Sequence, residues 1–105
     1  MKIYKLEYLP VALKDMLDIV KYIGNELKNP AAAENLANEF IESAESLTEF
    51  PYSNPVYYPI RPLKNEYRKL LVKNFIMFYY VDEPKKTITI ARVIYVKRDC
   101  GRIIE

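Results

Sequence analysis

The sequence contains no histidine and a single cysteine, Cys100. One cysteine cannot form an internal disulfide, and without a cluster of Cys and His there are no ligands for a structural zinc site. This composition is typical of a reducing compartment, so we expect a cytoplasmic protein without a cofactor, in which Cys100 is an ordinary residue of the tail. No apolar run approaches the roughly 20 residues of a membrane-spanning helix, and no signal peptide is visible.

The chain has 105 residues and 50% of them are hydrophobic, which is enough for one domain, 1–105, with its own core. Its charge is unevenly distributed. Residues 1–50 contain five Lys and nine Asp or Glu, a net charge of −4, whereas residues 51–105 contain eleven Lys or Arg and five Asp or Glu, a net charge of +6. The basic half predicts an acidic partner, either nucleic acid or an acidic polypeptide, while the acidic half is typical of solvated helices.

Three apolar runs, separated by two breaks of hairpin length, lie in the C-terminal half of the chain. The runs span residues 67–72, 75–81 and 87–96. Because they are rich in β-branched and aromatic residues, they predict a three-stranded antiparallel meander. The last run is apolar or β-branched on both sides except at Arg92, which is typical of a central strand. A basic pair, Lys97 and Arg98, follows it directly.

The N-terminal half predicts a strand followed by a helix. Tyr4, Leu6 and Tyr8 alternate with charged residues, which predicts a half-buried strand beside the central one. Apolar residues spaced three and four apart predict a helix over residues 10–23 that begins at a proline and stops near Gly24 and Asn25. Two aspartates, 15 and 18, fall outside its apolar stripe. Without a third ligand they make a poor cation site, so we expect them on a solvated face.

A second helix is predicted from Asn29 and Pro30, as N-cap and first helical residue, to Pro51. Its apolar stripe is expected to be buried on the sheet, and includes Leu36, Phe40, Ile41, Ala44 and Leu47. The predicted order is therefore β-α-α-β-β-β. This is an α+β fold, in which a helical hairpin packs on one face of a small, mostly antiparallel four-stranded sheet.

Residues 51–66 hold four of the seven prolines and fit no period, so we expect a stiff, extended loop. On this loop Arg61 and Lys64 lie near Tyr57 and Tyr58. Aromatic side chains beside cations are typical of stacking on nucleic-acid bases, and they are equally typical of ordinary loop packing.

Four segments in a fixed order carry a resemblance to a known family. They read LPxAxxDMxDIxxYI at residues 9–23, YRxL at residues 67–70, NFIMFYYVD at residues 74–82 and RVIYVKRD at residues 92–99. With this length and order of elements, the chain resembles the RelE/ParE superfamily of small bacterial and archaeal toxins. The resemblance implies the toxin of a type II toxin–antitoxin module of the plasmid stabilisation type, neutralised by an antitoxin encoded beside it. It leaves open a higher-order toxin–antitoxin complex.

The superfamily has two activities, and the RelE-like one implies a metal-independent endoribonuclease that cuts mRNA on the ribosome. Its basic side chains hold the scissile phosphate and stabilise the charge that develops, often with a C-terminal tyrosine as proton acceptor. By resemblance, Arg98 and Arg68 match two of the basic positions, and Tyr95 is the candidate to replace the tail tyrosine. The expected contacts with the target or partner are Lys97, Arg61 and Lys69.

Three departures from the RelE-like pattern argue against the ribonuclease. Ile76 stands where an arginine is usual, Leu70 replaces a second basic residue, and Ile104 lies about where the tail tyrosine would be. ParE-like members instead poison DNA gyrase without such a set of residues, and the helix pattern and the Tyr67-Arg68 strand fit that branch better. We therefore favour inhibition of DNA gyrase, with ribosome-dependent mRNA cleavage as the alternative.

The arginines near the strand ends have two interpretations. If the sheet order places Arg68 near Tyr95 and Arg98, these residues form one cationic patch that binds phosphate or an acidic protein surface. In the simpler interpretation the arginines are rim cations that tether Glu66 or Asp99. A second alternative function for the whole chain is a non-toxic module that binds its antitoxin and DNA.

Overall fold

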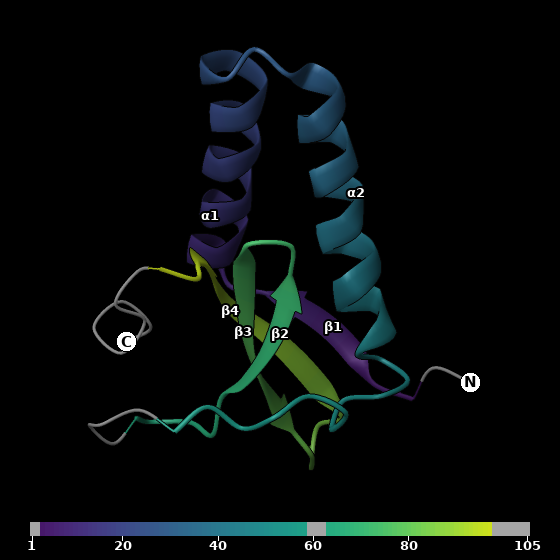
Figure 1. The fold of residues 1–105 in the computed structure, drawn as a ribbon. Helices are drawn as coiled ribbons and strands as arrows, with labels where there is room; N and C mark the ends of the chain where they lie inside the picture. The colour runs from purple at the N-terminus through teal and green to yellow at the C-terminus, as the bar shows by residue number, and fades with distance from the viewer. Residues whose placement is uncertain (1–2, 59–62, 98–105) are drawn as a thin grey trace.

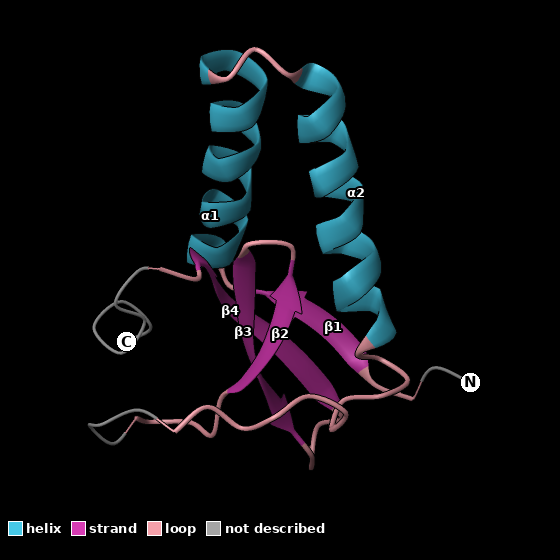
Figure 2. Ribbon diagram, viewed as in Figure 1, coloured by secondary structure: helices cyan, strands magenta, loops and turns pink. Residues whose placement is uncertain are grey.

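The computed structural model describes residues 3–58 and 63–97. Its elements follow the predicted order, with one additional π-helical turn, η1 (Figure 1). They are β1 (Lys5–Tyr8), α1 (Pro10–Lys21), η1 (Tyr22–Glu26), α2 (Pro30–Ser46), β2 (Arg68–Val72), β3 (Phe75–Asp82) and β4 (Thr87–Tyr95). The α1–α2 hairpin and the sheet form two layers, and the far ends of the helices extend past the β2–β3 turn (Figure 2). Among the described helices, none has the length and apolarity to span a membrane.

The sheet has the order β1-β4-β3-β2, which confirms β4 as a central strand. It pairs in parallel with β1 and antiparallel with β3. The register shifts once, because Phe78 pairs with Arg92 whereas Tyr79 pairs with Ile90, so that Ala91 is an extra, bulged residue. On the other edge β1 pairs only as far as Ile90. The second half of β4 therefore has no strand beside it on that edge among the described residues.

The main core lies between the helical hairpin and the sheet. One face of α2 is buried there through Ala33, Leu36, Phe40, Ala44 and Leu47, at the helical spacing that the sequence indicated. The prediction was wrong for Ile41, which is 50% exposed. Ile41 follows Phe40 directly and is rotated from it by about 100° around the helix, which turns its side chain away from the sheet.

The first helix does not stop at Gly24 and Asn25 as expected. It continues through η1 and ends at Glu26. Two residues later the chain turns at Lys28, which has a left-handed φ of 51°. Gly24 has another role, because a Cβ atom at this position would lie 3.4 Å from the Cβ atom of Ala33 on α2. The glycine therefore allows the two helices to approach closely rather than ending the first of them.

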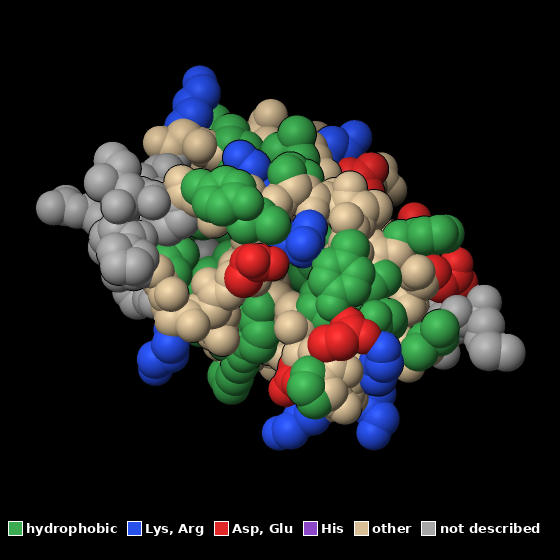
Figure 3. Space-filling model, turned by 90° about the horizontal axis from the view of Figure 1, so that it is seen from below, with side chains coloured by type: hydrophobic (Ala, Val, Ile, Leu, Met, Phe, Trp, Pro, Cys, Tyr) green, Lys and Arg blue, Asp and Glu red, His purple; other side chains and the backbone are tan. Residues whose placement is uncertain are grey.

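The opposite face of the sheet carries a smaller apolar cluster. Its buried members are Tyr67, Phe78, Ala91 and Ile94. The loop before β2 covers part of it, since the Tyr57 ring packs edge-on against Phe78 at 5.1 Å between centroids. This contact favours ordinary loop packing for Tyr57, whereas Tyr58 is 85% exposed. In Figure 3, which views the molecule from below, positive and negative side chains are interspersed among hydrophobic ones.

Candidate functional site

The sheet register places Arg68 and Tyr95, two of the site residues predicted from the sequence, far apart. Arg68 pairs with Tyr79, whereas Tyr95 pairs with Phe75 at the other end of β3. Because β2 and β4 both run antiparallel to β3, the start of β2 and the end of β4 lie at opposite ends of the sheet. The described residues therefore do not form the single cationic patch that we expected if these ends met. Arg61 and Arg98 lie outside the described residues.

Arg68 anchors the loop that precedes β2. Its Nη1 atom donates a hydrogen bond of 2.8 Å to the carbonyl oxygen of Asn54, and its guanidinium carbon lies 5.0 Å from the centroid of the Tyr52 ring. A longer ion pair of 3.7 Å joins it to Glu66. The side chain is only 17% exposed, so these contacts favour the interpretation of Arg68 as a tethered rim cation.

Glu83 ties three segments together close to this loop. Its carboxylate accepts hydrogen bonds from the Tyr4 hydroxyl, the Tyr52 hydroxyl and the Lys86 ammonium. The bonds from Lys86, Tyr52 and Tyr4 lower the pKa of Glu83 to about 2. The same carboxylate raises the pKa of Tyr52 to about 12. The start of the chain, the loop and the β3–β4 turn are thereby held at one end of the sheet.

Lys69 lies on the face of β2 opposite to Arg68 and takes no part in the contacts of Arg68 or of Glu83 described above. It lines a shallow pocket of about 320 Å³, together with Asn54, Pro55, Leu71 and Ile76. Lys69 pairs with Phe78 across the sheet, so it belongs to the face opposite the helices. Of the nominated residues that the structure describes, only Tyr95 and Lys97 remain together.

Tyr95 borders an apolar groove between the helical hairpin and the sheet. The groove has a volume of about 670 Å³ and is lined by Asp18, Ile19, Tyr22, Ile23, Leu27, Asn74, Phe75 and Tyr95. Its floor is continuous with the core, because Phe75 packs against Phe40 on one side and Tyr95 on the other, each at 5.8 Å between ring centroids. Tyr22 and Leu27 on its rim are each 56% exposed. We call this surface the apolar groove.

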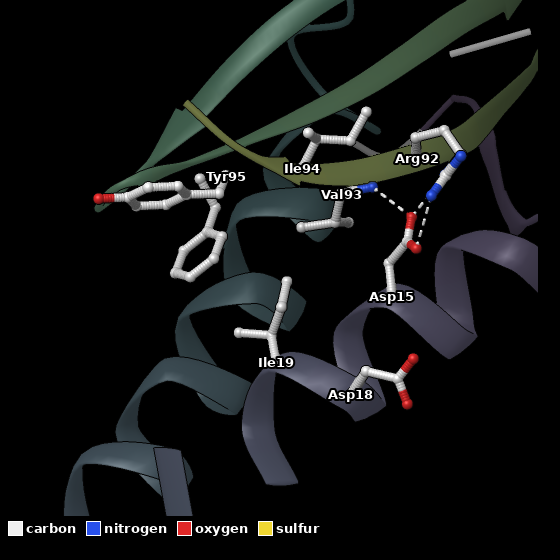
Figure 4. A pocket seen from close by; sticks show the side chains of 8 residues that line it. Asp15, Asp18, Ile19, Arg92, Val93, Ile94 and Tyr95 are labelled. Carbon is white, nitrogen blue, oxygen red and sulfur yellow. Dashed lines mark hydrogen bonds and ion pairs between the residues drawn. The ribbon is translucent and has the colours of Figure 1, made fainter. Parts of the chain in front are cut away.

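A smaller cavity of about 190 Å³ adjoins the groove and is lined by a half-buried ion pair between Asp15 and Arg92 (Figure 4). Asp15 accepts hydrogen bonds from Arg92 through Nε at 2.7 Å and through Nη2 at 2.9 Å. It also accepts a bond of 3.0 Å from the backbone N–H of Val93. The side chains of Arg92 and Asp15 are 22% and 15% exposed. The hydrogen bond that Arg92 donates to Asp15 raises the pKa of Arg92, which therefore stays charged.

This ion pair corrects the prediction that both aspartates of the first helix lie on a solvated face. Asp18 does so, with a side chain that is 59% exposed and paired with Lys14, but Asp15 does not. The sequence contained a signal for this contact, because Arg92 is the one charged residue in a strand that is otherwise apolar or β-branched. A half-buried cation is stabilised by an anionic partner, and the facing helix supplies it.

The lining of the groove is suited to binding a protein partner. Among the described residues, no group of three His, Cys, Asp or Glu is placed to hold a metal ion. The lining is mainly apolar and aromatic with a few polar groups at its rim, which is the character of a protein-binding surface. Exposed Tyr22 and Tyr95 have the amphipathic rings that are common in such contacts.

Comparison with known proteins gives one family and one fold. Residues 6–100 match the family described as ParE toxin of the type II toxin–antitoxin system parDE. The fold is similar to that of the chromosomal ParDE system from P. aeruginosa, with a TM-score of 0.71, 18% identity, and coverage of 92% of this chain and 100% of that one. No curated protein matches the sequence.

Two toxin–antitoxin complexes show the same fold at lower similarity. RelBE2 from Mycobacterium tuberculosis has a TM-score of 0.61 and 18% identity, over 88% of this chain and 96% of that one. The archaeal RelE–RelB complex from Pyrococcus horikoshii has a TM-score of 0.60 and 15% identity, over 91% of this chain and 98% of that one.

Proposed function

The chain belongs to the ParE toxin family of type II toxin–antitoxin systems, and we propose that it arrests growth by inhibiting DNA gyrase whenever its antitoxin is absent. The family and fold confirm the RelE/ParE resemblance that the sequence indicated. Two observations support gyrase as the target. They are the match to the ParE toxin family and the packing around Ile76, Leu70 and Arg68 on the sheet.

The contacts of these three residues favour gyrase over ribosome-bound mRNA as the target. A metal-free ribonuclease needs several cations aimed at one phosphate. Here Ile76 packs against the apolar cluster on the face opposite the helices, and Leu70 packs against the main core. Arg68 is engaged by Asn54 and Tyr52. Apolar packing at Ile76 and Leu70, where the ribonuclease pattern has cations, is the observation that carries the proposal.

The second part of the proposal concerns the antitoxin, which we infer occupies the apolar groove. A toxin of this family is controlled by a partner that binds it, and the groove is the large apolar hollow with aromatic side chains on its rim. Its dimensions suit the apolar face of an amphipathic helix or an extended segment. Gyrase and such an antitoxin both imply action in the cytoplasm.

Induced expression with two parallel readouts tests the proposed target. We expect growth arrest with loss of DNA supercoiling, induction of the DNA-damage response and intact transcripts. Co-expression of the protein encoded beside the toxin should restore growth. Cuts in mapped transcripts within minutes of induction, on supercoiled DNA, would instead establish the RelE-like ribonuclease. Full growth despite soluble, folded toxin would establish the non-toxic binding module.

A further inference from the structure

The two edges of β4 are held unequally over its second half. On one edge β3 pairs with it from Asp82 back to Phe75. On the other edge the pairing with β1 ends at Ile90, and the last main-chain bond there runs from the Leu9 N–H to the Ile90 carbonyl at 2.9 Å. The chain then leaves the sheet and starts α1 at Pro10. From Ala91 onward, the strand that ends in Tyr95 has no neighbouring strand on this edge within residues 3–58 and 63–97.

The carboxylate of Asp15 takes the place of the missing strand. It accepts the Val93 N–H at 3.0 Å, as a carbonyl of a continued β1 would. It also accepts hydrogen bonds from two nitrogens of the Arg92 guanidinium, Nε and Nη2, in a two-point contact. Asp15 lies on the second turn of α1, so a rigid helix fixes the carboxylate relative to the strand. Figure 4 shows the dashed contacts from Arg92 and Val93 of β4 converging on Asp15.

The position of this contact relates it to the residues that we expect to act. The bulge at Ala91 lies immediately before Arg92, and bulges bend a strand and re-aim the side chains that follow. Tyr95 and Lys97 lie two and four residues beyond Val93. Without Asp15, the main chain of this bulged end would be paired with β3 alone among the described residues, although Val93 and Ile94 would remain buried in the two apolar clusters.

We propose that Asp15 is a positioning residue for toxicity, which fixes the end of β4 so that Tyr95 and Lys97 are presented to the target in one orientation. The inference rests on the proposed toxin function but not on the identity of the target. It predicts that loss of the carboxylate loosens residues 92–96 locally and weakens growth arrest, while the rest of the fold persists.

The test compares Asp15→Asn with a matched control, Glu39→Gln. Both remove a helix carboxylate that pairs with a cation. Glu39 lies 3.8 Å from Lys73, which is in the β2–β3 turn and not on a strand. For each variant, amide hydrogen exchange is measured residue by residue, and growth arrest is measured at matched protein levels. Asp15→Glu, which retains a carboxylate, serves as the conservative variant.

In Asp15→Asn we expect amide exchange at residues 92–96 to accelerate about tenfold and the toxin level for half-maximal arrest to rise about tenfold, because a hydrogen bond to a charged group is lost. Exchange at residues 88–90 should remain close to wild type. Asp15→Glu should recover part of both effects, and Glu39→Gln should show neither.

Three results would overturn the proposal. They are uniform acceleration or unfolding throughout Asp15→Asn, local loosening with undiminished growth arrest, and an Asp15→Glu variant as inactive as Asp15→Asn. A wild-type toxin that arrests growth but leaves gyrase active would refute only the proposed target. The comparison of variants would then still decide the role of Asp15.

Discussion

Arg68 and Tyr95 lie at opposite ends of the sheet, on two strands separated by β3. Their pairing partners, Tyr79 and Phe75, are four positions apart on β3, a distance of about 13 Å along the strand. The basic residues of the C-terminal half therefore do not converge on one point. Arg68 belongs to the end where Glu83 and the loop before β2 are anchored, while Tyr95 and Lys97 belong to the end that borders the apolar groove. Substitutions at the two ends of the sheet should therefore have different effects.

Arg68→Ala should destabilise the protein without removing its toxicity. The substitution deletes a charge-assisted hydrogen bond to Asn54 and the contact with the Tyr52 ring, and we expect the free energy of unfolding to fall by about 1–3 kcal/mol. Lys69→Ala, at the next and exposed position, should change it by less than about 0.5 kcal/mol. Urea denaturation and growth assays check this. A folded Arg68→Ala protein that no longer arrests growth would show that Arg68 contacts the target.

Arg98→Ala should abolish growth arrest while the fold and antitoxin binding survive. In the sequence the basic pair Lys97 and Arg98 follows the end of β4 after one residue, Val96, and a cation close to a rigid strand end loses little entropy when it binds. Lys85→Ala is the control, because it removes an exposed cation at the β3–β4 turn at the other end of the sheet. Growth assays at matched expression measure the effect. If Arg98→Ala arrests growth as strongly as the wild type, the basic pair does not contact the target and is only solvated.

Tyr22→Asp should weaken the complex with the antitoxin. The Tyr22 side chain is 56% exposed on the rim of the groove, so the change costs little stability but places a charge in an apolar contact. We expect the dissociation constant to rise at least about tenfold, because buried aromatic anchors dominate such interfaces. Tyr58→Asp, on the loop and 85% exposed, is the control. Equal affinity for both variants in calorimetry would place the antitoxin elsewhere.

Glu83→Gln should make stability less dependent on acid. The folded-state pKa of Glu83 is about 2, below its ordinary value of 4.5. Its stabilising effect is therefore complete above pH 4.5 and is lost as the pH falls through about 2. The melting temperature of Glu83→Gln should lie below that of wild type at pH 7, and the gap should narrow toward pH 3. The control is Glu42→Gln on the exposed face of α2. A gap independent of pH would contradict the assignment.

The periodic parts of the fold could be predicted from the sequence, because burial imposes its own spacing. The spacing of Leu36, Phe40, Ala44 and Leu47 predicted the buried face of α2, and apolar residues on both sides of residues 87–96 predicted a central strand. Ile41 was misplaced because its hydrophobicity counts toward a stripe, whereas the contact with the sheet is narrower than that stripe.

The candidate site was harder to predict, because it depends on where strands stop. Nothing in the sequence states that pairing with β1 ends at Ile90 or that Ala91 is a bulge, and both decide that Asp15 meets Val93. The separation of Arg68 from Tyr95, in contrast, was already implied by the predicted antiparallel meander, because its first and third strands run in the same direction. The groove is formed by side chains from α1, η1 and the ends of β3 and β4, which no single motif contains.

The most direct test of the central claim is a supercoiling assay with purified gyrase and purified toxin. The account predicts that the wild-type protein blocks supercoiling of relaxed plasmid, that Arg98→Ala does not, and that an equimolar amount of the antitoxin restores the reaction. The same preparation should leave mRNA on translating ribosomes intact. Unimpaired supercoiling at a toxin excess that cuts ribosome-bound mRNA would contradict the account.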